Sequence, residues 1–230
     1  MVVLDPAFAA SHENNQVIVD GESMPAGLVE VADHFLGHLP HRRITVLDDT
    51  VGRACAPLLD AAGYVHEIEL IMTYSGPDTV VDERVGPVSL DDLLPAVEHQ
   101  LRLWMPDAEE TVIRHLAGRR TARLRSADQV HFLAARDESG AIASWADVYL
   151  DPERQIAQIE DLVTAEAHTR RGYADAVLAA ALTRASTYEL RFLLAAAADW
   201  PRQWYARRGF VEIGRSHVFT RVDAAARAER

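Results

Sequence analysis

Short apolar runs alternate with segments of helical spacing along most of the chain. The runs predict strands at residues 80–85, 130–135, 141–150, 155–163 and 190–196. Apolar side chains three and four residues apart predict helices at 89–104, 108–119, about 175–187 and from 201 onward. Gly209 is expected to end the last helix, and two closing strands follow it. The predicted order from residue 79 to residue 222 is therefore β-α-α-β-β-β-α-β-α-β-β.

The first 78 residues form a separate region in this pattern. A short strand at 43–47 leads to a helix at 50–62, and a long strand at 64–74 follows. The turn-forming stretch Ser75–Asp78 then marks a boundary. We expect an N-terminal region at 1–78, a second domain at 79–222 and a C-terminal tail at 223–230.

One arrangement occurs twice in the chain. In Leu59–His66 a helix ends at Gly63 and an aromatic residue begins a strand, and Tyr205–Glu212 repeats this around Gly209. Two interpretations stay open. The first region is either a truncated, non-catalytic copy of part of the second domain, or an unrelated α/β extension that is similar by chance. Strand orders that differ between the two regions would exclude a repeat.

The stretch Thr169–Ala174 lies between a predicted strand and a predicted helix. Free N–H groups at a helix N-terminus and the helix dipole both favour a bound anion. Gly172 allows the backbone to approach a ligand closely, and Arg170 and Arg171 add positive charge. The stretch therefore predicts a pyrophosphate site, although an ordinary solvated connection can have the same sequence.

A second motif follows at Tyr205–Phe210, which reads Tyr, three residues, Gly, Phe. In this order, with a strand between them, the two motifs resemble the last third of the GNAT family, the acyl-CoA-dependent N-acyltransferases. The phosphate loop of that family reads Gln or Arg, two residues, Gly, one residue, and Gly or Ala. Thr169 departs from this pattern, and Asp199 lies near the place where many members have Asn. We interpret Asp199 as a helix cap.

The resemblance covers about residues 79–222 and implies an α+β GNAT fold with a mixed, mostly antiparallel sheet, a splayed centre and helices on both faces. A truncated GNAT-like half before it would make the fold a tandem. The resemblance also implies acetyl-CoA as co-substrate. The strand before the loop would hold the pantetheine arm and the acetyl group, and the loop would hold the pyrophosphate. By residue matching, the cofactor-binding residues are Leu162, Val163, Thr164, Thr169, Arg170, Arg171, Gly172, Tyr173, Ala174 and Asp175.

Tyr205 matches the general acid of the family, which protonates the departing thiolate. A phenol with a pKa of ~10 suits that role, although a packed tyrosine with a hydrogen-bonded hydroxyl is the alternative. For the general base we prefer Glu160 over Asp161, because strand alternation puts Glu160 on the face of Leu162 and Thr164. A bulge would invert this parity. A salt bridge at Glu160, with a water chain as the base, is the other interpretation.

The composition of the chain argues against several other classes of function. The chain has 230 residues, 49% of them hydrophobic, with a net charge of −12, which argues against a nucleic-acid surface. It contains no apolar run of membrane-spanning length, no signal-peptide pattern and no metal-ligand spacing. The single cysteine, Cys55, is expected to be a core residue in a reducing, cytoplasmic setting. Arginine supplies all 23 basic residues, a usage that hints at a bacterial source.

We therefore expect an N-acetyltransferase that passes the acetyl group of acetyl-CoA directly to a primary amine, with a small molecule as the favoured acceptor. No metal, nucleic acid or membrane is expected as a partner, and a homodimer is left open. One alternative is a non-catalytic acyl-CoA-binding module, and another is a scaffold. A third keeps the enzyme but gives it a longer acyl-CoA.

Overall fold

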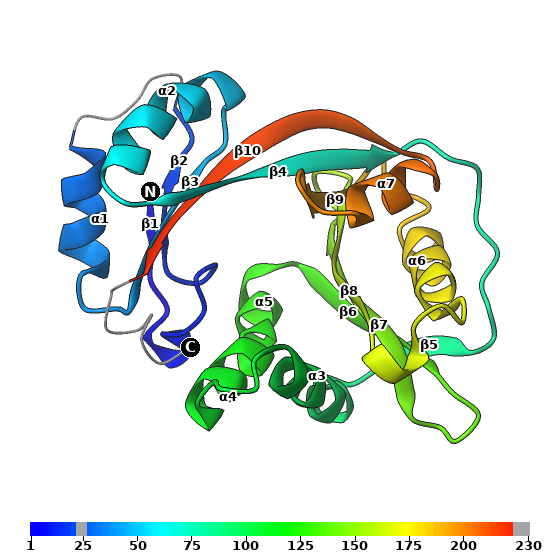
Figure 1. The fold of residues 1–230 in the computed structure, drawn as a ribbon. Helices are drawn as coiled ribbons and strands as arrows, with labels where there is room; N and C mark the ends of the chain where they lie inside the picture. Colours follow the sequence, from blue (N-terminus) through cyan, green and yellow to red (C-terminus); the bar gives the residue numbers. More distant parts are fainter. Residues whose placement is uncertain (22–26, 223–230) are drawn as a thin grey trace.

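Within the described residues, one sheet of ten strands has the order β1-β2-β3-β10-β4-β9-β8-β7-β6-β5. The computed structural model describes residues 1–21 and 27–222 (Figure 1), so the expected tail at 223–230 lies outside the described residues. The strands are β1 (Val2–Val3), β2 (Gln16–Val19), β3 (His41–Val46), β4 (Val65–Tyr74), β5 (Val85–Val88), β6 (Gln129–Arg136), β7 (Ile142–Asp151), β8 (Ile156–Thr164), β9 (Leu190–Ala196) and β10 (Phe210–Val222). The helices are η1 (Pro6–Phe8), α1 (Leu28–Leu36), α2 (Asp49–Ala61), α3 (Leu90–Trp104), α4 (Glu110–Gly118), α5 (Arg120–Ser126), η2 (Glu166–His168), α6 (Tyr173–Arg184) and α7 (Pro201–Ala206).

The strand order repeats within the sheet. In the first region the parallel pair β2–β3 is joined through α1, and α2 then leads to the long strand β4. In the second region the parallel pair β8–β9 is joined through α6, and α7 leads to β10. The two long strands pair antiparallel at the centre, so the orders β2-β3-β10-β4 and β8-β9-β4-β10 are the same. This shared order supports a structural repeat over a chance similarity.

The two regions exchange strands at this centre. Strand β4 lies between β9 and β10, and strand β10 lies between β3 and β4 (Figure 1). The sequence pattern predicted two closing strands after Gly209, but the structure has only β10 there among the described residues. The position expected for the second closing strand is filled by β4, which comes from residues 65–74.

Two further elements differ from the prediction. The strand expected at 80–85 begins only at Val85, because Asp82 forms a turn with the N–H groups of Arg84 and Val85. The helix expected at 108–119 breaks at Arg119 and continues as α5. The break turns Arg120 and Arg123 of α5 toward β7 and β8.

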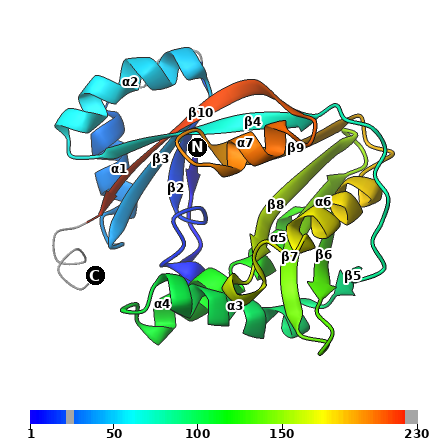
Figure 2. The ribbon, with the colours of Figure 1, turned by 45° about the vertical axis from the view of Figure 1, so that its right-hand side comes forward.

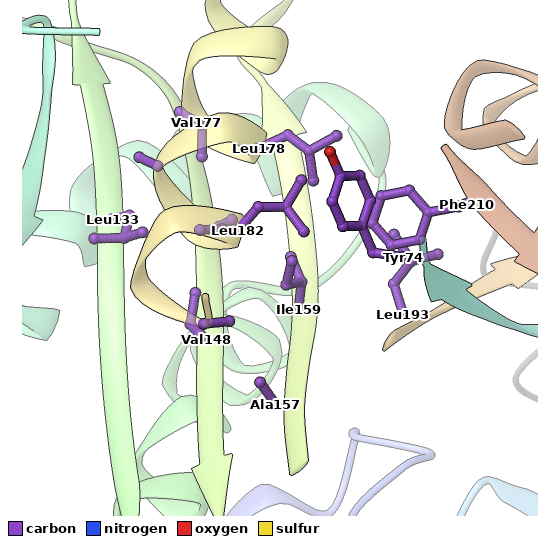
Figure 3. Packing of buried hydrophobic residues seen from close by; sticks show 14 of the residues in the cluster. Tyr74, Leu133, Val148, Ala157, Ile159, Val177, Leu178, Leu182, Leu193 and Phe210 are labelled. Carbon is purple, nitrogen blue, oxygen red and sulfur yellow. The ribbon is translucent and has the colours of Figure 1, made fainter. Parts of the chain in front are cut away.

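Helices cover both faces of the second half of the sheet. Helix α6 packs on one face, and α3, α4 and α5 gather on the other (Figure 2). Leu178 and Leu182 of α6 meet residues of β7 and β8, and they also approach Tyr74 of β4 and Phe210 of β10 (Figure 3). The core of the second region therefore includes a side chain supplied by the first. A separate core under α1 and α2 contains Cys55 at 0% exposure, which confirms its prediction as a core residue.

Candidate active site

The parallel strands β8 and β9 separate soon after they begin. They pair only from Ile156 to Gln158, whereas β8 continues to Thr164. A bulge follows in β8, where Asp161 adopts a left-handed conformation with φ of 50°. Bulges bend a strand and leave backbone groups unpaired. The expected splayed centre is therefore present, and it opens next to Leu162, Val163 and Thr164.

The bulge changes which side chains share a face. Glu160 pairs with Asp147 of β7 and Val163 pairs with Trp145, two positions on the same face of β7. Thr164 pairs with Ser144, on the opposite face. The expectation that Glu160 shares a face with Thr164 was wrong, because the extra residue in β8 shifts the alternation by one.

The loop before α6 offers a row of backbone donors. Arg170 and Gly172 both have positive φ, 62° and 80°, which turns successive N–H groups toward one side. Among the described residues, no hydrogen bond engages the N–H groups from Arg170 to Asp175. The Thr169 hydroxyl is 3.1 Å from the carbonyl of Glu166, so it donates within the loop. This geometry fits an anion such as pyrophosphate.

A cleft of about 750 Å³ joins this loop to the end of β8 and to α7. The sequence-predicted residues that line it are Leu162, Val163, Thr164, Thr169, Arg170, Gly172, Tyr173, Ala174, Asp175 and Tyr205. Arg171 is exposed and does not line the cleft, and neither does Glu160. The Asp175 carboxylate forms an ion pair with Arg208 from beyond the end of α7.

Tyr205 sits where two cavities meet. Its ring lies edge-on to Phe210, with centroids 5.6 Å apart, and it borders both the cleft and a second cavity of about 470 Å³. Burial raises the pKa of Tyr205 to about 12. The phenol therefore stays protonated through the physiological range, as a hydrogen-bond donor must.

Glu160 lines the second cavity with Tyr205 and Leu162. Gln158 donates to Glu160 through Nε2 at 2.6 Å, and Arg123 lies 3.5 Å from the other carboxylate oxygen. Burial raises the pKa of Glu160 to about 7, against the opposing charge of Arg123. A carboxylate with this pKa is matched to proton abstraction near neutral pH.

Asp161 has a different environment. Burial would raise the pKa of its carboxyl group, but the guanidinium groups of Arg120 and Arg119, at 2.7 and 3.2 Å, outweigh burial and lower it. Asp161 is therefore an ion-pair partner and a poor base. Behind it, Asp147 is fully buried, pairs with Arg120 at 2.9 Å and accepts a hydrogen bond from Tyr149.

Comparison with known proteins identifies the second region. The acetyltransferase (GNAT) family model matches residues 97–210, which include the splayed strands, the loop and Tyr205. Residues 97–210 form a GNAT acetyltransferase domain. This match and the mixed sheet confirm the predicted family and α+β fold class, and members of the family use acyl-CoA. No curated protein matches the chain.

Several solved structures share the fold of the chain that carries this GNAT domain. A functionally unknown conserved protein from Staphylococcus epidermidis has a TM-score of 0.71 at 12% identity, covering 96% of this chain and 90% of its own. A tandem GNAT protein from the clavulanic acid biosynthesis pathway has a TM-score of 0.59 at 16% identity, covering 86% and 70%. A GCN5-related N-acetyltransferase from Kribbella flavida has a TM-score of 0.54 at 16% identity, covering 90% and 80%. At these identities the likeness shows the fold alone.

The first region lacks the opening of the GNAT domain. Strands β2 and β3 stay paired up to Val19 and Val46, and the Leu47 N–H then donates to the Val19 carbonyl at 2.9 Å. A backbone that is paired in this way has no free groups to bind a pantetheine arm. The splayed site is therefore found in the second region only, within residues 1–21 and 27–222.

Three tryptophans of the GNAT cleft were missed by sequence reasoning. Trp104, Trp200 and Trp204 line the cleft, and the guanidinium of Arg208 lies 3.6 Å from the centre of the Trp204 ring. Trp104 and Trp200 are exposed by 59% and 66%, and that exposure is not readable from a helical pattern. The cap assigned to Asp199 is displaced by one residue, since its carboxylate accepts from the N–H of Trp200, which is itself the N-cap.

Two other kinds of feature are absent from residues 1–21 and 27–222. No helix there has the length and apolar character that crossing a bilayer requires. Nor does that part of the chain bring together three or more His, Cys, Asp or Glu side chains in an arrangement suited to a metal ion.

Proposed function

We propose that this protein transfers the acetyl group of acetyl-CoA directly to a primary amine of a small molecule. The observation that carries the proposal is the single cleft that joins the loop, the open end of β8 and Tyr205. The second cavity supports a small acceptor, because it meets the cleft at Leu162 and Tyr205 and is walled by residues of the first region. Its volume of about 470 Å³ suits a small-molecule ligand.

The loop before α6 suits the cofactor because its backbone N–H groups are free to bind the pyrophosphate. The N–H groups of Arg170 to Asp175 would hold the pyrophosphate, helped by the dipole of α6 and by the Arg170 side chain. The end of β8 at Leu162 to Thr164, which is paired with β7 but not with β9, would hold the pantetheine arm on its open side. When bound, acetyl-CoA supplies an activated thioester, and the chain itself supplies orientation and proton transfer.

Glu160 and Tyr205 would divide the proton transfers. Glu160, with a pKa of about 7, would take a proton from the acceptor ammonium, directly or through a water molecule. Tyr205 would donate a hydrogen bond and then a proton to the departing sulfur. With its pKa at about 12, the phenol is a weak acid, so stabilising the sulfur by hydrogen bonding is the larger part of its role.

A second candidate keeps the reaction but changes the acyl group. A largely apolar cavity of about 170 Å³ meets the cleft at Trp104 and Val163. It is walled by α3, α4 and Trp145, and the ion-paired Arg120 and Asp161 also line it. An acyl chain longer than acetyl would extend into it. Competition between acetyl-CoA and longer acyl-CoAs in the same assay separates the two candidates.

Thermal unfolding with and without acetyl-CoA tests the cofactor site. Ligand at a hundredfold its Kd adds about 2.7 kcal/mol of apparent stability, or roughly 5–10 °C for a chain of this size. The shift should shrink in Arg170→Ala and persist in Arg154→Ala, an exposed arginine of the β7–β8 turn. No shift with any acyl-CoA would favour a scaffold. A shift without turnover of any amine would favour a non-catalytic acyl-CoA-binding module.

A further inference from the structure

The second cavity has an unusual set of walls, because both regions of the chain contribute to it. Strands β2, β3 and β4 of the first region and β8 and α5 of the second all contribute lining residues. Glu13 bridges the two regions, with its carboxylate 2.9 Å from Arg119 and 3.9 Å from Arg123. The cavity is therefore fixed by ion pairs that cross between the regions.

Charge in and behind this cavity is not balanced. Five carboxyl groups and four guanidinium groups lie in and behind the cavity, so one negative charge is in excess when every carboxyl group is ionised. The carboxylates are Glu13, Glu69, Asp147, Glu160 and Asp161, and the guanidinium groups are Arg43, Arg119, Arg120 and Arg123. One ammonium group on a ligand would balance the network, whereas a carboxylate or phosphate would increase the excess.

Strands β3 and β4, on the first region's side of the cavity, carry a loosely held pair. Arg43 lies 3.5 Å from the Glu69 carboxylate and 3.5 Å from the Thr45 hydroxyl, both longer than an ordinary hydrogen bond. Burial raises the pKa of Glu69, against the charge of Arg43. A ligand hydroxyl suits this pair, because it can accept from Arg43 and donate to Glu69 at once. A second ammonium would be repelled by Arg43, and a ligand carboxylate by Glu69.

We propose that the acceptor is a hydroxylated primary amine without an acidic group, with its ammonium at Glu160 and a hydroxyl at the Arg43–Glu69 pair. This inference rests on the proposed function and adds the class of acceptor. It gives the first region a recognition role, since Arg43 and Glu69 both come from that region. Gln16, Thr45 and Gln158 add polar atoms to the same walls, consistent with a polar ligand body.

Two matched acceptor sets test the class by the release of CoA thiol. The first is ethanolamine, propylamine and glycine, and the second is glucosamine, cyclohexylamine and glucosamine 6-phosphate. We expect the hydroxylated, non-acidic member to exceed both others at least tenfold in kcat/KM in at least one set. Preference for the apolar or acidic member in both sets overturns the inference. The inference is also overturned if no member of either set is turned over while acetyl-CoA still raises the melting temperature. In that case the melting shift continues to support the proposed cofactor site.

Variants on the preferred acceptor test the residues. Glu69→Gln should raise the acceptor KM about tenfold. The kcat should stay within twofold of its original value, and the KM for acetyl-CoA should not change. Glu67→Gln is the matched control, because Glu67 is exposed on the same strand and does not line the cavity. An unchanged acceptor KM in Glu69→Gln, or an equal rise in Glu67→Gln, overturns the role given to Glu69.

Discussion

Arg120 and Asp147 form a buried ion pair, with Nε of Arg120 2.9 Å from Oδ2 of Asp147 and exposed side-chain fractions of 4% and 0%. The pair lies behind the β8 bulge, and Arg120 also reaches Asp161 at 2.7 Å. Two charges held in this way are costly to separate, because removing one leaves the other buried without a partner.

Arg120→Met should therefore lower the free energy of unfolding by about 3–5 kcal/mol, measured by urea denaturation. Adding Asp147→Asn should restore part of that loss, since the remaining side chain is then neutral. Arg102→Met serves as a surface control, because Arg102 forms its ion pairs with Glu98 and Glu110 at the exterior. An equal loss in the control would mean that burial of the Arg120 pair is not the cause.

The pKa of Glu160, about 7, predicts the pH dependence of the reaction. A general base acts as the carboxylate, so kcat/KM should be low below pH 7 and rise as pH passes through that value. Glu160→Gln should abolish this limb. Arg123→Met should move it to higher pH, because the Arg123 charge holds the carboxylate form, whereas Arg125→Met, at an exposed position of the same helix, should not. A limb that survives in Glu160→Gln assigns the base elsewhere.

Tyr205→Phe should lower kcat by about a hundredfold or more, the range for losing a hydrogen-bond or proton donor in the transition state, and leave the KM for acetyl-CoA nearly unchanged. The ring of Phe keeps the packing against Phe210, so the melting temperature should hold. Steady-state kinetics and a thermal melt on the same preparation check both parts. An unchanged kcat would return Tyr205 to the packed-tyrosine interpretation.

Local pattern was enough to predict contiguous segments that the structure places along one cleft. The loop at 169–174 and Tyr205 were found because turn, cap and helix signals lie within a few residues of one another. The face on which Glu160 lies was predicted wrongly, because Asp161, in a left-handed conformation, breaks the alternation of β8. Aspartate tolerates that conformation better than most residues, but its presence alone does not require it.

Pairings between distant segments could not be predicted from the sequence. No local feature of residues 65–74 says that the strand lies between β9 and β10, more than a hundred residues later. Elements β1, β2 and α1 were also missed. The strands β1 and β2 are only two and four residues long, too short to show an alternating pattern. The second cavity is lined by these missed strands and by strands whose pairing could not be predicted. Sequence reasoning therefore could not connect Arg43 and Glu69 with Glu160.

The closed pairing of β2 with β3 predicts a single cofactor site per chain. Isothermal titration with acetyl-CoA should give one site, although the strand order occurs twice. Arg170→Ala should weaken that one site without revealing a second. A stoichiometry near two would show that the first region opens in solution and binds the cofactor as well.

The exchange of β4 and β10 predicts that the region from residue 79 onward does not fold alone. Without β4, the ladder groups of β9 and β10 lose their partner, and buried Leu70 and Met72 leave the shared sheet. Unpaired strands expose backbone and apolar surface, which favours aggregation. Residues 79–230 expressed alone should be insoluble or give no cooperative melt, whereas co-expression with residues 1–78 should yield a soluble complex that binds acetyl-CoA. A folded, cofactor-binding 79–230 would show that β4 is dispensable and that β9 and β10 can pair directly.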